Sequence, residues 1–186
     1  MTSIDVRVTI ALQAKLAQVP LAQLEALGAQ VFLVGGLVRI LVFNSIHGTN
    51  LPFSDYDLLV TNLEQKRLTA VLAEQGKADL VGASFGVIKF RPRSVEGEPS
   101  SFDIAVPRLE SSTGVGAKNV LIQTHPTLTL EQDLSRRDAT MNAMAIRVRD
   151  ILSVPPGLQS ILVVDPENGV EHIRQKRGGR SCKTFW

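Results

Sequence analysis

The sequence predicts an α+β fold in which helices flank a mixed, mostly antiparallel sheet. Short apolar runs of strand length recur along the chain, and segments with helical apolar spacing lie between some of them. Stretches rich in glycine, proline and polar residues separate these elements. Strands and helices do not alternate strictly, and this pattern favours a mixed sheet over a fully parallel one.

The first elements are expected to be helix, helix and strand. Residues 4–18 have apolar spacing compatible with a helix that ends before Pro20. Pro20 suits the start of a second short helix through Leu27, and Gly28 is its expected stop. The apolar run VFLV, residues 31–34, is typical of a buried strand. We further expect a helix at 37–46, a strand at 55–61 and a helix at 63–75.

Strands dominate the expected second half of the chain. Residues 107–128 contain clustered prolines and glycines with little periodicity, which predicts a long loop. Residues 92–100 are turn-rich and predict a hairpin loop. Residues 129–144 are expected to be helical. The strands expected here cover residues 79–82, 86–91, 101–106, 145–149 and 160–164.

Composition indicates a soluble globular protein. Hydrophobic residues make up 44% of the 186 residues and charged residues 20%, with a net charge of only +2. The total therefore excludes a strongly basic protein, although residues 171–186 form a basic end, which is usually solvated but suits RNA phosphates. The single cysteine, Cys182, makes no internal disulfide. Without a predicted signal peptide or membrane span, we expect a cytoplasmic protein with no membrane partner.

Two acids at the start of an expected strand are the first candidate site residues. Asp55 and Asp57 are two residues apart, so their side chains would share one face of a strand. Close carboxylates repel unless a cation lies between them, and Mg²⁺ takes one or two carboxylates together with water and phosphate oxygens. The pair therefore suits a metal–triphosphate complex, although an Asp-x-Asp sequence alone is more often a pair of surface acids.

A strand, a glycine pair and a helix follow one another in VFLVGGLVR. Gly35 and Gly36 allow the backbone to approach a phosphate, and a helix N-terminus offers unpaired N–H groups. Arg39 adds a guanidinium that suits phosphate oxygens. A tight turn beside a surface arginine remains the alternative interpretation.

Two further segments carry candidate residues. Asp103 lies inside the apolar strand FDIAV, where a shared metal would supply its partner; an exposed aspartate on an edge strand is the alternative. In LSRRDATMNAMA, Asp138 and Asn142 would share one face of a helix. Arg136 and Arg137 would enter from the preceding turn, completing a cradle for triphosphate and ribose.

Taken in order, LVGGLVR, SDYDLLVT, FDIAVPRLESSTGVG and LSRRDATMNAMA resemble the head domain of the poly(A) polymerase and tRNA nucleotidyltransferase family. The likeness is to the bacterial-type class II CCA-adding enzymes. It covers about residues 20–175, and VVDPENGVEHI resembles the stretch that joins the family's head to its neck. Ile40 stands where the family usually has an aspartate.

The resemblance implies a polymerase-β-like nucleotidyltransferase fold and a set of roles. Asp55, Asp57 and Asp103 would be the catalytic, metal-binding residues, holding two Mg²⁺ ions. The nucleotide-binding residues would be Gly35, Gly36, Arg39, Arg136, Arg137, Asp138 and Asn142. The implied reaction is transfer of AMP or CMP from ATP or CTP to an RNA 3′-hydroxyl, with the tRNA 3′ end as acceptor and pyrophosphate as product.

The expected organisation is a head domain over residues 1–165, followed by a truncated linker or neck stub over 166–186. We therefore also expect association with a chain that supplies neck and body domains. Three alternatives stay open: a non-catalytic or truncated nucleotide-binding remnant of this family, a nucleotidyltransferase for a small acceptor, and a dinucleotide-binding domain. The last fits poorly, because the glycine pattern is incomplete.

Overall fold

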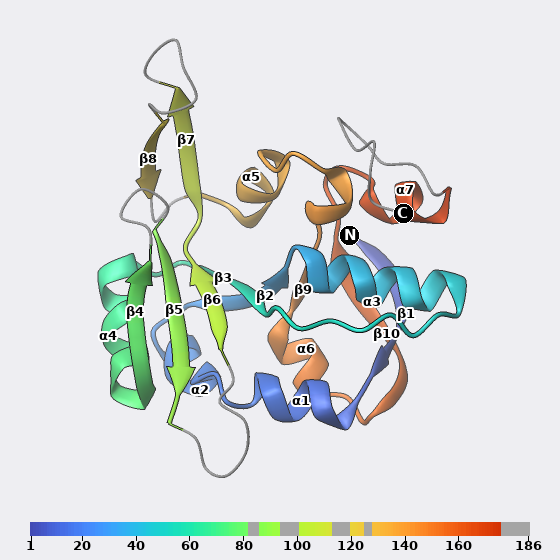
Figure 1. Cartoon of the computed structure of the whole chain (residues 1–186), viewed down its shortest axis with the longest axis horizontal. Helices are drawn as coiled ribbons and strands as arrows, with labels where there is room; N and C mark the ends of the chain where they lie inside the picture. The colour runs from blue at the N-terminus through green and yellow to red at the C-terminus, as the bar shows by residue number, and fades with distance from the viewer. Residues whose placement is uncertain (82–85, 94–100, 113–119, 125–127, 176–186) are drawn as a thin grey trace.

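An eight-stranded sheet forms the frame of the chain, with strand order β1–β10–β9–β2–β3–β6–β5–β4 (Figure 1). The computed structural model describes residues 1–81, 86–93, 101–112, 120–124 and 128–175, and only the backbone of 109–112 and 120–124. The strands of the sheet are β1 (Thr2–Val8), β2 (Gln30–Val34), β3 (Asp57–Thr61), β4 (Gly76–Val81), β5 (Val87–Pro92), β6 (Phe102–Ala105), β9 (Ala145–Arg147) and β10 (Gly157–Val164).

The sheet is mixed, as the sequence predicts. Strands β3 and β6 are parallel, and every other neighbouring pair in the sheet is antiparallel. A second ribbon, β7 (Arg108–Ser112) paired with β8 (Val120–Thr124), projects beyond the sheet (Figure 1). The helices are α1 (Ile10–Leu16), α2 (Leu21–Ala26), α3 (Gly36–His47), α4 (Gln65–Gln75), α5 (Leu130–Ser135), α6 (Val148–Leu152), α7 (Gly169–Arg174) and the 3₁₀ turn η1 (Thr140–Asn142). The predicted α+β class is confirmed.

The central strands are buried on both faces. Along β2, Val31 and Leu33 belong to the main hydrophobic core, while Phe32 and Val34 belong to a smaller second core that α5 covers. This alternation follows from the two-residue period of a strand. A continuous apolar run such as VFLV is therefore what a strand with two covered faces requires.

The N-terminal prediction is wrong in part. Residues 2–8 form β1, which pairs antiparallel with β10 from Thr2↔Val163 to Val8↔Gly157, and the helix starts only at Ile10. Ile4, Val6 and Val8 are buried at alternate positions, as in a half-buried strand. Thr9 then caps α1 by accepting a hydrogen bond from the Leu12 backbone N–H at 3.1 Å.

The long helix predicted over 129–144 is also wrong. A capping box between Thr129 and Gln132 starts α5, which ends at Ser135. The extended backbone of Ala139 (φ −117°, ψ 126°) interrupts the helical path before η1. The segment can then place Met141 in the main core and Ala143 in the second core. Asp138 and Asn142 consequently do not lie one helical turn apart on a common helix.

Other differences concern shorter segments. The predicted loop 107–128 contains the β7–β8 ribbon, because paired strands satisfy each other's backbone groups. The predicted strand 145–149 ends at Arg147 and continues as α6. The loop residues 94–100 and the basic end 176–186, with Cys182, lie outside the described residues. Within the described part of the chain, no helix is long and apolar enough to cross a membrane.

Candidate active site

A glycine turn connects β2 to α3 at the centre of the sheet. Gly35 has φ 72° and ψ −139°, a conformation that L side chains rarely adopt. A Cβ atom on Gly35 would lie 3.2 Å from Oδ2 of Asp57 and 3.6 Å from Nη1 of Arg137. The absence of a side chain thus lets the carboxylate and the guanidinium approach the turn. Gly36 begins the 12-residue helix α3, whose N-terminus points positive charge toward the same space.

Asp57 begins β3 and carries the perturbed carboxyl group of the site. Burial raises the pKa of Asp57 above its ordinary value, the nearby charges of Asp103 and Asp55 raise it further, and Arg137 acts in the opposite direction. The ionised form of Asp57 is therefore disfavoured in the folded chain, first by burial and then by the neighbouring acids. This is the electrostatic setting that a divalent cation relieves.

Asp103 lies beside Asp57 on the neighbouring strand. The two residues are register partners in the parallel pair of β3 and β6, and this pairing depends on the tertiary fold. Nζ of Lys89 on β5 lies 3.8 Å from Oδ1 of Asp103. Asp55 precedes β3 and is exposed. The predicted strand 55–61 therefore begins two residues too early, and only Asp57 of the two acids lies on it.

The donor set fits a magnesium ion bound with a phosphate ligand. The described residues contain no group of three acids, histidines or cysteines arranged to hold a metal by themselves. Mg²⁺ ordinarily takes only one or two carboxylates from a protein and completes its octahedron with water and substrate oxygens. Asp57 and Asp103, at paired positions of adjacent strands, meet that requirement.

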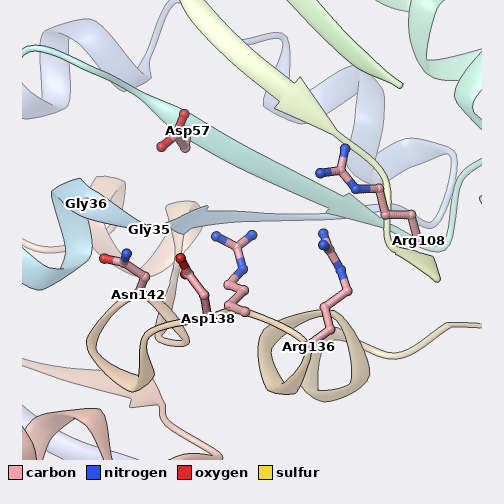
Figure 2. Close-up of a pocket in the computed structure, with 8 residues that line it drawn as sticks. Gly35, Gly36, Asp57, Arg108, Arg136, Asp138 and Asn142 are labelled. Atoms are coloured by element: carbon pink, nitrogen blue, oxygen red, sulfur yellow. The ribbon is translucent and has the colours of Figure 1, made fainter. Parts of the chain in front are cut away.

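Arginine side chains line the wall opposite Asp57. Arg136 and Arg137 follow α5 and are held by the buried carboxylate of Asp133. Arg108, at the start of β7, reaches into the same space from the end of the sheet (Figure 2). Nε of Arg137 is buried and has no hydrogen-bond partner among the described residues, so this lining side chain keeps an unused donor.

These groups enclose a pocket of about 490 Å³. Figure 2 shows Asp57 on one side and Arg136, Asp138 and Asn142 on the other, with the glycine turn between them. The lining residues are Gly35, Gly36, Asp57, Arg108, Arg136, Arg137, Asp138 and Asn142. A pocket with one carboxylate wall and one guanidinium wall is suited to a polyanion that carries a metal.

Most of the predicted nucleotide-binding residues thus meet in one pocket. Arg39 lies next to it, where its Nη1 donates a 2.6 Å hydrogen bond to Oδ1 of Asn142. Asp55 and Asp103 are not among the lining residues. Their negative charges affect the pocket indirectly, because they raise the pKa of Asp57.

Sequence reasoning missed Arg108 and Asp133. Arg108 follows the FDIAVP strand directly, so its position at the strand end was a usable signal. Asp133 precedes Arg136 and Arg137 by three and four residues, the spacing of ion pairs on a helix. Nothing in the sequence, however, indicates that Asp133 is buried.

The fold, with its pocket beside the glycine turn, is that of a polymerase-β-like head domain. Residues 31–177 match the family described as the poly A polymerase head domain. The chain belongs to this family.

Curated relatives carry CCA-related names. A multifunctional CCA protein of Paracidovorax citrulli is 33% identical over 147 residues, which cover 79% of this chain and 29% of the relative. A multifunctional CCA protein of Actinobacillus pleuropneumoniae is 38% identical over 116 residues, which cover 62% of this chain and 24% of the relative. The chain thus spans less than a third of the length of these relatives.

Solved structures of CCA-adding enzymes share the fold. An apo form superposes with a TM-score of 0.63 at 22% identity and covers 94% of this chain and 38% of its own. The Bacillus stearothermophilus enzyme in complex with CTP gives a TM-score of 0.57 at 23% identity, covering 87% of this chain and 32% of its own. These likenesses confirm the polymerase-β-like head.

Proposed function

We propose that this chain is an RNA nucleotidyltransferase head that transfers AMP or CMP from a nucleoside triphosphate to an RNA 3′-hydroxyl. A CCA-adding enzyme of Thermotoga maritima that shares the fold is known in complex with tRNA, which favours the 3′ end of tRNA as the acceptor. The observation that carries the proposal is the pocket in which the Asp57 carboxylate lies across the glycine turn from Arg136, with Arg137 also in the lining.

Each wall of the pocket has a proposed task. The guanidinium groups of Arg108, Arg136 and Arg137 bind the triphosphate oxygens, and the N–H groups at Gly35 and Gly36 receive another phosphate oxygen. Asp138 and Asn142 contact the ribose, and Arg39 fixes the side chain of Asn142. The protein thereby positions the α-phosphorus for attack, which is its main contribution to phosphoryl transfer.

Asp57 and Asp103, with Asp55 beside them, are the proposed magnesium ligands. Magnesium bound there would lower the pKa of the attacking hydroxyl and offset charge on the phosphate oxygens. In the reaction the hydroxyl oxygen bonds to the α-phosphorus, the bond from that phosphorus to the bridging oxygen breaks, and pyrophosphate and a proton leave.

Incorporation of labelled nucleotide tests the proposal. The chain is incubated with labelled ATP or CTP and a tRNA that lacks its 3′ end, with and without Mg²⁺. Asp57→Asn and Asp55→Ala are expected to lose Mg²⁺-dependent incorporation, whereas Asp5→Asn, an exposed acid on β1, should retain it.

The outcomes separate the candidate functions. Binding of Mg-ATP without incorporation would support a nucleotide-binding remnant. Transfer of the nucleotide to a small hydroxyl compound but not to RNA would support the small-acceptor class. An Asp57→Asn variant as active as the parent chain would contradict the proposed metal role.

A further inference from the structure

Asp133 is a charged residue enclosed in the wall of the pocket. Its side chain is 0% exposed, whereas those of Arg136 and Arg137 are 22% and 21% exposed. It lies in the short helix α5, next in sequence to Leu134 of the second core. A fully buried carboxylate is costly unless it is paired and hydrogen-bonded.

The partners of Asp133 are the arginines that line the pocket. Its Oδ1 accepts hydrogen bonds from Nε of Arg136 at 2.9 Å and from Nη2 of the same side chain at 2.7 Å. Its Oδ2 accepts a hydrogen bond from Nη2 of Arg137 at 3.2 Å. The backbone N–H of Arg108 donates to Oδ1 at 3.4 Å. One carboxylate therefore contacts all three arginines of the pocket.

These contacts determine where the guanidinium groups lie. An arginine side chain has many rotamers, and ordering it costs conformational entropy. Nε and Nη2 of Arg136 both donate to Oδ1 of Asp133, and these two bonds fix the plane of the Arg136 guanidinium group. The hydrogen bond from Nη2 of Arg137 to Oδ2 of Asp133 orients the guanidinium group of Arg137. Both groups are thus oriented before any ligand arrives, a form of preorganisation that strengthens binding.

We propose that Asp133 is a positioning residue, whose buried carboxylate holds Arg136, Arg137 and the start of β7 in the geometry that receives a polyphosphate. The inference rests on the proposed function, because it assigns the arginines to a phosphate ligand. Asp133 itself touches neither the substrate nor the metal; it acts through the arginines.

Neutralising Asp133 changes the affinity for a polyphosphate, and the direction of this change distinguishes a positioning role from a purely electrostatic one. A carboxylate beside two guanidinium groups lowers the positive potential in the pocket. If Asp133 did nothing more, its neutralisation would strengthen the binding of a polyanion. If it positions the arginines, neutralisation weakens that binding, because two side chains must then be ordered by the ligand.

The experiment measures the binding of Mg-ATP and of inorganic tripolyphosphate to the 186-residue chain by calorimetry. We expect Asp133→Asn to weaken both by about 10-fold or more, the scale of a lost hydrogen bond to a charged group. Glu131→Gln is the matched control, because it removes the same charge from an exposed position in the first turn of α5. It should bind like the parent chain.

A double-mutant cycle and an NMR signal exclude a merely structural effect. Asp133→Asn should have little further effect in a chain that already carries Arg136→Gln and Arg137→Gln. In the parent chain, the Nε–H resonance of Arg136 should be sharp and protected from exchange before ligand is added. The NMR measurement needs no variant. If Asp133→Asn does not fold, Asp133→Glu replaces it in the binding experiment, because it keeps the charge but displaces the carboxylate oxygens.

Each result decides the matter. Equal or tighter binding by the folded Asp133 variant, or an unprotected Arg136 Nε–H in the parent chain, overturns the positioning role and leaves the proposed function standing. A parent chain that binds neither ATP nor tripolyphosphate overturns the proposed function and this inference with it.

Discussion

Arg39 and Asn142, 103 residues apart in sequence, are joined by a 2.6 Å hydrogen bond from Nη1 of the arginine to Oδ1 of the asparagine. The bond connects α3, which starts at the glycine turn, to η1, which closes the opposite side of the pocket. Two segments that each carry proposed nucleotide contacts are therefore held together by one side-chain pair.

Removal of this acceptor should weaken nucleotide binding. Asn142→Ala takes away the oxygen that orients Arg39, and we expect about 10-fold weaker Mg-ATP binding, since hydrogen bonds to charged groups contribute about 1.5–3 kcal/mol. Calorimetry measures the change, with Gln23→Ala, an exposed amide on α2, as the control. Additive losses in a cycle with Arg39→Gln would show that the two residues act separately.

The glycine turn should tolerate no side chain. Gly35→Ala places a Cβ 3.2 Å from Oδ2 of Asp57 at a φ of +72°, so we expect a loss of about 1–3 kcal/mol in the free energy of unfolding. Displacement of Asp57 should also abolish nucleotide incorporation.

Gly48→Ala is the matched control for the glycine turn. Gly48 also has a positive φ, +63°, but apart from its chain neighbours no atom of the described residues lies within 4 Å of its Cβ position. It should lose about 1 kcal/mol in urea denaturation because of its left-handed backbone, and should keep full activity. Normal activity of folded Gly35→Ala would contradict the proposed close approach.

The raised pKa of Asp57 predicts a stability that falls with pH. Between the ordinary value of 3.8 and the raised pKa, the native chain holds a proton that the unfolded chain has lost. The free energy of unfolding therefore decreases as pH rises through this window, and ionised Asp57 destabilises the native chain above it. Asp57→Asn should accordingly be more stable than the parent at about pH 7, with a smaller difference below the window.

Urea denaturation across this pH range checks the sign. Mg²⁺ should raise the stability of the parent chain at neutral pH, because a bound cation favours ionised Asp57, and should do so far less in Asp57→Asn. Asp5→Asn, the exposed control on β1, should follow the parent at every pH. A variant less stable than the parent at neutral pH would contradict the assigned cost of ionising the buried Asp57 carboxyl group.

Close packing joins helix α7 to η1. A Cβ on Gly169 would lie 2.4 Å from the backbone oxygen of Thr140, and the hydroxyl of Thr140 is 2.7 Å from Nδ1 of His172. Gly169→Ala should therefore cost about 1–3 kcal/mol in the free energy of unfolding. Gly36→Ala, also at the first residue of a helix, has its nearest atom 3.9 Å away and should not lower stability. Thermal unfolding compares the two, and equal stabilities would refute the steric argument.

The predictable parts of this protein rest on local signals. The VFLV run is buried as β2, and the glycine pair after it forms the turn into α3. Helix α2 begins after Pro20 and stops before Gly28, whose φ is +82°. Proline and glycine impose backbone conformations through their own covalent structure, so such boundaries are visible without knowledge of the fold.

Elements that depend on distant partners were not predictable in the same way. The first residues have apolar spacing that suits a helix, yet Thr2–Val8 becomes a strand by pairing with β10, about 150 residues later. The helix predicted through Asn142 breaks where Ala139 turns extended, so that Met141 and Ala143 enter different cores. Tertiary packing overrides local propensity at both places.

The sequence by itself determined the mixed fold class, the glycine turn and the kinds of side chain that a metal–triphosphate site needs. Only the tertiary structure decided that Asp57 and Asp103 are register partners, that Arg108 joins the arginine wall, and that a buried Asp133 holds this wall in place. The physical reason is that side-chain chemistry belongs to a residue, whereas burial and proximity arise only when segments distant in the chain pack together.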